Sequence, residues 1–236
     1  MSRYALPAHV FICLNGEHFV LLDLKKDRYL ALDSAKVAAL AGVVQGWPAS
    51  PHPVTELAAE SAESVAQLLI ERGLLNANST GEPVQRRDAA VAPCIEQLVA
   101  DEYEESVRIT WRVLATFIFS FFTATLFVRL LPLERAVRRV AARRSHAGES
   151  PLERERARQL LLVFGRLRAY FFTSRDACLF ESFALIEFLS HHDILPRWVF
   201  AVHARPFAAH CWVQQEGLVL NDTVEHVSGY TPIMVV

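Results

Sequence analysis

The chain has 236 residues, 52% of them hydrophobic and 21% charged, which suits one large domain or two small ones. This composition excludes a disordered chain, because such a chain lacks the apolar surface that offsets the entropy lost on folding. Its 9 glycines and 11 prolines exclude a collagen-like or low-complexity chain. The formal net charge of −2 argues against a protein dedicated to nucleic acids, whose affinity rests on neutralising phosphates.

Three short apolar runs separated by turn signals open the chain and predict a small antiparallel sheet. The expected strands cover residues 10–14, 18–24 and 28–32. Asn15-Gly16 favours a tight turn after the first strand, since both residues tolerate positive φ. Three helices are expected next, over residues 33–44, 56–60 and about 61–72, with Gly73 ending the last one. These elements predict a winged-helix-like module over residues 1–80.

A polar stretch at residues 76–88 lacks a periodic apolar pattern and carries Gly81 and Pro83, as linkers commonly do. We therefore place a linker over residues 81–94 and a second domain over residues 95–236. That domain is expected to open with an acidic helical segment at residues 101–105.

An uncharged apolar run follows from Val113 to Val128, between Arg112 and Arg129. As a helix its 16 residues would be roughly 24 Å long. A membrane span needs ~20 residues, so the run is too short to cross a bilayer. We expect it to be a core helix of the second domain. A helix that docks on a partner protein or on a membrane surface is the alternative.

The end of the chain combines a helix and a set of strands that can carry catalytic residues. Residues 175–190 predict a helix, with Cys178 within about one turn of its start, where the helix dipole stabilises a thiolate. Strands are expected over residues 197–204, 208–215 and 218–221, with a turn at Glu216-Gly217. His210 falls on the middle strand, with Trp212 and Gln214 on the same face, and Asp222 ends the last strand.

This order of residues suits nucleophilic catalysis. A thiolate needs a neighbouring base, and the base needs an acceptor that orients its second nitrogen. Cys178, His210 and Asp222 supply these groups in order. Spacing alone is also compatible with a non-catalytic core in which a helix packs on a hairpin. Other histidines compete for the role of base, namely His191, His192, His203 and His226.

The four cysteines, Cys13, Cys94, Cys178 and Cys211, are too few and too scattered for a disulfide-rich domain. Cys211, on the strand face opposite His210, is expected to be a packed thiol. No CxxC pair suggests a zinc site, and we expect neither a metal nor another cofactor. Because the amino-terminal sequence lacks the features of a signal peptide, we expect a cytoplasmic protein with free thiols.

Short motifs near the catalytic candidates carry a family likeness. They are Cys-Leu-x-x-Ser at Cys178, Leu179 and Ser182, then Pro206, Phe207, Ala209, His210, Trp212 and Val213, then Gly217, and finally Asn221-Asp222. In these motifs the chain resembles the B protein of lasso-peptide biosynthesis, a family of the transglutaminase-like cysteine protease superfamily. The likeness is close over residues 174–222 and loose over residues 100–236.

The resemblance implies an α+β fold with a transglutaminase-like, papain-like cysteine protease domain after the winged-helix-like module. It makes Cys178 the nucleophile, His210 the general base and then acid, and Asp222 the residue that orients the imidazole. Cys211 and Gln214 depart from the family pattern, in which a small Ala and frequently a Glu occupy these positions.

The amino-terminal module resembles the family's leader-recognition element, which is similar to the chaperone of pyrroloquinoline quinone biosynthesis (PqqD-like). The resemblance implies that a leader peptide adds as an extra strand along Arg28, Tyr29, Leu30, Ala31 and Leu32. It also implies that apolar leader side chains meet the last helix at Val65, Leu68 and Leu69, although these residues can equally form the core of the module.

The implied function is that of a leader peptidase for ribosomally made lasso peptides, a class that includes antibiotics. Such a hydrolase binds the leader of the precursor peptide, cleaves it from the core and hands the core to an asparagine-synthetase-like cyclase that consumes ATP. An acyltransferase of the same superfamily and a non-catalytic precursor chaperone are the alternatives. The expected partners are the precursor and the cyclase, without nucleic acid, and peripheral membrane contact stays open.

Overall fold

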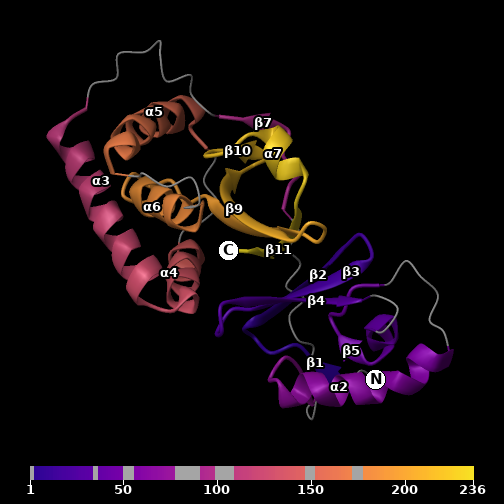
Figure 1. Cartoon of the computed structure of the whole chain (residues 1–236). Coiled ribbons are helices and arrows are strands. Elements are labelled where there is room, and N and C mark those ends of the chain that lie inside the picture. The colour runs from indigo at the N-terminus through magenta and orange to yellow at the C-terminus, as the bar shows by residue number, and fades with distance from the viewer. Residues whose placement is uncertain are drawn as a thin grey trace. The chain divides into compact units, whose positions relative to one another are not determined.

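The computed structural model describes residues 3–33, 37–49, 56–77, 91–98, 109–146, 152–171 and 178–236. The fold is mixed α+β, and the chain divides into two compact units (Figure 1). The first contains Met1–Ala90, Ala201–Ala209 and Thr231–Met234, and the second contains Val91–Phe200, His210–Tyr230 and Val235–Val236. Most of the expected linker and the acidic segment at 101–105 lie outside the described residues, so the domain boundaries stay a prediction.

The predicted antiparallel sheet is present near the amino terminus. Its strands are β2 (Val10–Asn15), β3 (His18–Asp23) and β4 (Arg28–Asp33), in the order β2-β3-β4. Gly16 has φ 58°, as the Asn-Gly turn requires, and Asp27 has φ 47° in the second turn. Phe19 and Leu21 of the central strand are fully buried in the core of this unit. Within the described residues, β4 is therefore an edge strand.

The helices of this unit differ from the prediction. The helix expected over residues 33–44 is wrong where the structure describes it: a 3₁₀ turn, η1 (Ala38–Gly42), is followed by strand β5 (Val44–Gln45). The reason is that Val44 pairs in parallel with Tyr4 of β1 (Tyr4–Ala5), which also pairs with β6 (Asn76–Ala77). These strands form a second sheet, β5-β1-β6.

One helix, α2 (Glu56–Glu71), replaces the two short helices expected over residues 56–72. The alanines and glutamates near residue 60 are good helix formers and carry it through the expected break. Gly73 ends it as predicted, with φ 74°, and the Leu74 N–H donates to the Leu69 carbonyl at 2.8 Å. The winged-helix identity of the module stays a prediction.

Helices form one layer of the second unit. They are α3 (Trp111–Ala124), its π-helical continuation η2 (Thr125–Leu130), α4 (Leu133–His146), α5 (Arg154–Phe171) and α6 (Cys178–Ser190). The Phe188 ring of α6 lies against Phe117 of α3 and Phe164 of α5, at 6.2 and 5.7 Å between centroids. In Figure 1, α6 accordingly lies among the other helices, whereas α3 runs along their outer edge.

The carboxy-terminal strands form a five-stranded sheet in the order β11-β8-β9-β10-β7. The strands are β8 (Arg197–His203), β9 (Ala208–Gln215), β10 (Leu218–Val219), β11 (Thr231–Val235) and β7 (Glu96–Gln97), and a short helix, α7 (Val224–Ser228), precedes β11. The two longer predicted strands are confirmed. The third is shorter than expected, because the Asn221 side chain accepts from the Val213 N–H at 2.7 Å in place of a backbone carbonyl.

The apolar run at residues 113–128 is not the core helix we expected. It belongs to a continuous helix of 20 residues, Trp111–Leu130, of which only 22% of the most apolar window is buried. Among the described helices, this is the one that is long and apolar enough to cross a membrane by length and composition.

Candidate active site

Cys178 lies at the first described position of α6, and a buried hydrogen-bond network fixes the turn behind it. The Ser182 hydroxyl donates to the Cys178 carbonyl at 2.6 Å and accepts from the Trp198 indole N–H of β8 at 2.9 Å. Ser182 and Trp198 are both fully buried. The serine of the Cys-Leu-x-x-Ser motif thus ties the start of α6 to the sheet.

His210 and Asp222 form an ion pair at the open end of the β9–β10 hairpin. Nε2 of His210 lies 2.5 Å from Oδ2 of Asp222, and the two side chains are only 13% and 15% exposed. Because Nε2 faces Asp222, Nδ1 is the ring nitrogen left for the hydrogen bond that joins His210 to Cys178. The structure therefore brings the three predicted catalytic residues together.

The electrostatics of the site favour a thiolate paired with an imidazolium. A hydrogen bond from the Cys211 thiol, followed by bonds from His210 and the Cys211 backbone, lowers the pKa of Cys178 to about 4 against the effect of burial. Burial alone would lower the pKa of His210, but its bonds with Asp222 and Cys178 raise it to about 9. At neutral pH both groups are charged, which is the reactive form of a cysteine nucleophile.

Asp222 stabilises the charged form of His210 through its carboxylate. Burial opposes its charge, but the hydrogen bond from His210, then the Thr223 N–H at 2.7 Å and His226, lower its pKa. Nδ1 of His226 lies 3.0 Å from both oxygens of Asp222, and its ring centroid is 4.7 Å from that of His210. Among the competing histidines, His226 is therefore the one that joins the site, through Asp222 rather than as the base.

The remaining histidines have other contacts. His192 shares a hydrogen bond with Thr116 at 3.2 Å, the His191 ring lies 5.3 Å from that of Phe119, and His203 lies 3.0 Å from the Pro206 carbonyl. In the described chain, a metal-ligand cluster is offered by His210, Asp222 and His226, whose ligand atoms lie within 4.8 Å of one another. The same atoms already form the hydrogen bonds that order His210.

Cys211 is more than the packed thiol predicted from its strand position. It is buried, its sulfur lies 3.4 Å from the Ser182 hydroxyl, and its thiol is hydrogen-bonded to the Cys178 sulfur. Donation to Cys178, followed by burial, raises the pKa of the Cys211 thiol well above its usual range, so it stays protonated as a donor. Strand alternation correctly puts it opposite His210, but that face meets the start of α6.

Gln214, the second departure from the family pattern, also has a local reason. The stacked rings of His210 and Trp212 confirm the predicted face, and the Trp212 indole N–H donates to the side-chain oxygen Oε1 of Gln214 at 3.0 Å. The Gln214 amide nitrogen donates to the Ala92 carbonyl at 2.6 Å, which a carboxylate could not do. The Cys94 thiol donates to the same Gln214 oxygen at 3.0 Å. Gln214 therefore supports Trp212 and holds the segment before β7.

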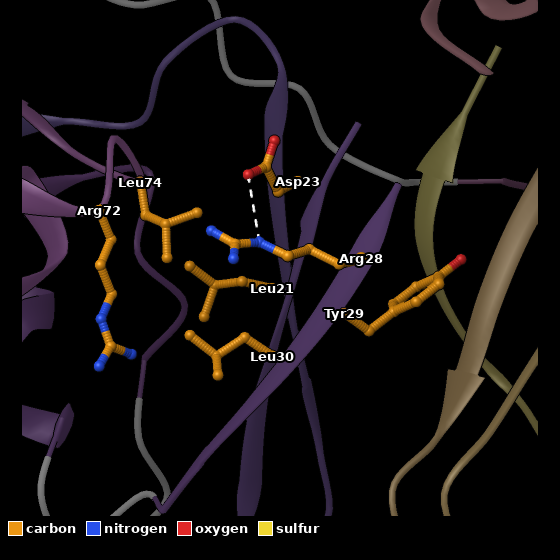
Figure 2. Close-up of a pocket in the computed structure, with 7 residues that line it drawn as sticks. All are labelled: Leu21, Asp23, Arg28, Tyr29, Leu30, Arg72 and Leu74. Carbon is orange, nitrogen blue, oxygen red and sulfur yellow. Dashed lines mark ion pairs between the residues drawn. The ribbon is translucent and has the colours of Figure 1, made fainter. Parts of the chain in front are cut away.

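The predicted peptide-binding residues of the first unit lie on β4 and α2. Arg28, Leu30 and Leu32 lie on one face of β4 and Tyr29 on the other, as Figure 2 shows for Arg28, Tyr29 and Leu30. Ala31 is an exposed residue of the same strand. A pocket of about 300 Å³ lies here, lined by Leu21, Asp23, Arg28, Tyr29, Leu30, Arg72 and Leu74. Nε of Arg28 lies 3.5 Å from Oδ2 of Asp23, and this ion pair holds the guanidinium at the pocket.

On α2 the structure separates the three predicted residues. Leu68 is 45% exposed and Val65 is partly buried, whereas Leu69 is 2% exposed and belongs to the core of the unit. The prediction that Leu69 contacts the leader is therefore corrected: its side chain lies in the core of the module and does not reach a surface where a peptide could bind.

Comparison with protein families matches residues 121–235 to the transglutaminase-like superfamily. Neither the search of curated proteins nor that of solved structures gave a match. The matched region contains Cys178, His210 and Asp222, and superfamily members are in general cysteine-based enzymes. Residues 121–235 of this chain, just under half of its length, are therefore similar to the transglutaminase-like superfamily.

Proposed function

We propose that the protein is a cysteine peptidase that removes the leader from a ribosomally made lasso precursor peptide in the cytoplasm. One observation carries the catalytic part: Cys178, with its pKa lowered to about 4, is hydrogen-bonded to His210, which lies 2.5 Å from Asp222. This arrangement has a nucleophile, a base and an orienting carboxylate in the order that thiol catalysis requires.

In the proposed reaction, the Cys178 thiolate attacks the carbonyl carbon of the scissile peptide bond. The C–N bond breaks as the leaving amine takes a proton from the His210 imidazolium, which leaves a thioester. Water then attacks the thioester and gives a proton to His210, and the Cys178 sulfur departs as the thiolate. Backbone N–H groups at the start of α6, which have no partner inside the helix, stabilise the oxyanion.

The proposed leader site is the exposed edge of β4 with the pocket beside it. Backbone groups of an edge strand bind an added strand, and side-chain pockets select its residues. Holding the precursor by its leader raises the effective concentration of the scissile bond at Cys178. The freed core peptide then passes to an ATP-dependent cyclase that resembles asparagine synthetase, the expected partner.

The direct test incubates the full chain with a lasso precursor peptide and follows the products by mass. We expect leader and core peptides whose summed mass exceeds that of the precursor by one water, and no product with the Cys178→Ala variant. A product in which an added amine replaces the water would make the protein an acyltransferase. Binding of the precursor without any turnover by the wild type would make it a chaperone.

Leader binding is tested separately with the Cys178→Ala chain and a fluorescent leader peptide. Leu68→Glu puts a charge on the exposed apolar position of α2, and we expect it to weaken binding by about tenfold. Gln67→Glu adds the same charge at the neighbouring exposed position and serves as the matched control. Equal binding by both variants would remove α2 from the leader site.

A further inference from the structure

The helix Trp111–Leu130 presents its aromatic and aliphatic side chains outward. Trp111 is 75% exposed, Phe119 54% and Phe122 65%, and Leu114, Ile118, Leu126 and Leu130 are exposed beside them. At about 100° per residue the five side chains within α3 fall on one half of the helix, and Leu126 and Leu130 follow in the π-helical segment η2. We call these seven residues the apolar face. In Figure 1, α3 lies at the outer edge of the helices of the second unit.

The opposite half of the same helix is buried and more polar. Its buried residues are Phe117, Ser120, Thr123 and Ala124. The Ser120 and Thr123 hydroxyls donate to the carbonyls of Thr116 and Phe119 at 2.7 and 2.9 Å, which satisfies them inside the domain. A helix in water usually turns such residues outward and its phenylalanines inward. This reversal indicates that something apolar covers the outer half.

Positive charges flank the apolar face. Arg112 and Arg129 are exposed near its two ends, the Arg129 guanidinium lying 5.2 Å from the centre of the Phe180 ring of α6, and no acidic residue occurs from residue 109 to residue 133. Arg112 lies over the Trp111 ring at 5.5 Å, so an aromatic ring and a cation share one end. Between the two arginines the exposed side chains carry no hydrogen-bonding group. An apolar stripe with a Trp and flanking arginines is the pattern of a helix at a membrane interface.

We propose that the apolar face of α3 and η2 is a docking surface for an anionic lipid bilayer. The helix lies in the plane of the interface, with its phenylalanines among the acyl chains and Arg112 and Arg129 at the headgroups. It does not cross the bilayer, since its inner half packs on α6. A crossing would carry the buried Glu187 and its partners Arg139 and Arg143 to membrane depth.

The charges argue for lipid over a second copy of the chain. In a pair of these helices packed face to face, each end would bring two arginines together without an acidic partner, in parallel and in antiparallel arrangement alike. Protein interfaces also carry about one hydrogen bond per 100–200 Å², for which the apolar face has no groups between its arginines. Phosphate headgroups supply the missing negative charge.

The full-length protein carries its own probe for this proposal. Of its four tryptophans, Trp111 is exposed, whereas Trp47, Trp198 and Trp212 are 6%, 0% and 2% exposed. Vesicles of phosphatidylcholine alone and of an equal mixture with phosphatidylglycerol are added, and flotation is measured together with Trp emission. We expect flotation with the mixed vesicles and a blue shift of Trp111 emission that the Trp111→Phe variant lacks.

Paired variants separate the apolar and charged contributions. The double variant Phe119→Gln/Phe122→Gln is expected to lower partitioning by more than about tenfold. Arg112→Gln/Arg129→Gln is expected to lower the preference for the anionic vesicles by about fivefold for each arginine. Ile95→Gln, at a 78% exposed apolar residue elsewhere, is the control and should float as the wild type does.

Three outcomes would overturn the proposal. They are a wild type that stays unbound with both vesicles, a Phe119→Gln/Phe122→Gln variant that floats like the wild type, and a dimer that this variant disperses while vesicles leave it unaffected. None of these readouts involves peptide cleavage, so the membrane proposal and the leader peptidase proposal can fail independently.

Discussion

Helices α3 and α6 lie side by side and are similarly apolar, yet the structure uses them in opposite ways. Nine of the 13 residues of α6 are buried, including Phe183 and Phe188 at 0% exposure. Four of the 14 residues of α3 are buried, and two of those are Ser120 and Thr123. Hydropathy therefore identifies both segments as apolar, but it does not say which will form the core. The neighbours that each face meets decide that.

The two halves of α6 also have different tasks. Its first residue, Cys178, has a backbone carbonyl that accepts from Ser182 and a sulfur that is hydrogen-bonded to His210 and Cys211, so the amino-terminal turn carries the proposed chemistry. Further along, Phe188 and Glu187 anchor the neighbouring helices. The comparison thus predicts three classes of substitution: loss of activity at the start of α6, loss of stability in its middle, and neither on the outer half of α3.

The largest effect is expected at Cys178. Cys178→Ser keeps the shape of the side chain but replaces a thiol of low pKa with a hydroxyl that is not ionised at neutral pH. We expect precursor cleavage to fall by more than about 10³-fold, and the free energy of unfolding at neutral pH to fall as well, because the stabilised thiolate of the folded state is lost. Single-turnover kinetics and urea unfolding measure the two quantities. A variant that retained a tenth of the activity would remove Cys178 from the chemistry.

The next largest effect separates the two helices directly. Phe188→Ala on α6 should lower the free energy of unfolding by about 3–5 kcal/mol, because it leaves a cavity among packed rings. Phe122→Ala on α3 should change it by less than about 0.5 kcal/mol, since Phe122 is 65% exposed. Urea unfolding of both variants is the measurement. Equal losses would mean that the outer half of α3 is covered within the protein itself.

A third comparison contrasts a buried and a more exposed glutamate, both paired with arginines of α4. Glu187 is fully buried and accepts from Arg139 at 2.9 Å and Arg143 at 2.6 Å, which joins α4 to α6. Glu187→Gln should cost about 3 kcal/mol, because it leaves two guanidinium groups without their carboxylate. Glu134→Gln breaks the pair with the exposed Arg138 and should cost about 0.3 kcal/mol. Similar costs in thermal or urea unfolding would show that Glu187 is hydrated in solution.

The sequence allowed the strands and the faces of β9 to be predicted because short-range signals specify them, and the family resemblance added the expectation that Cys178, His210 and Asp222 lie together. Asn15-Gly16 and Glu216-Gly217 mark turns with positive φ, and the period of two orients His210 and Trp212 on β9. Those signals do not depend on distant parts of the chain. They therefore survive into the folded structure.

The failures have the opposite origin. Residues 38–42 form only a 3₁₀ turn because Val44 pairs with β1, some forty positions away. Leu68 and Leu69 differ in exposure because of where β3 packs on α2, and the outward orientation of Phe122 depends on the placement of α6. Cys211 became part of the site because the start of α6 packs on its strand face. Such contacts between elements leave no local signal in the sequence.

The smallest effect concerns this last contact. The Cys211 thiol donates to the Cys178 sulfur and thereby stabilises its charged form, so Cys211→Ala should raise the pKa of Cys178 above its present value of about 4. The sign follows because removal of a donor penalises only the thiolate. Iodoacetamide should then label Cys178 about threefold more slowly near pH 5, where the wild type is already ionised, with little change near pH 8.

The matched control is Cys94→Ala, at a cysteine whose thiol is hydrogen-bonded to Gln214 and not to Cys178. A labelling midpoint that did not move would assign the low pKa of Cys178 to His210 alone, and would return Cys211 to the packed thiol that its strand position predicts.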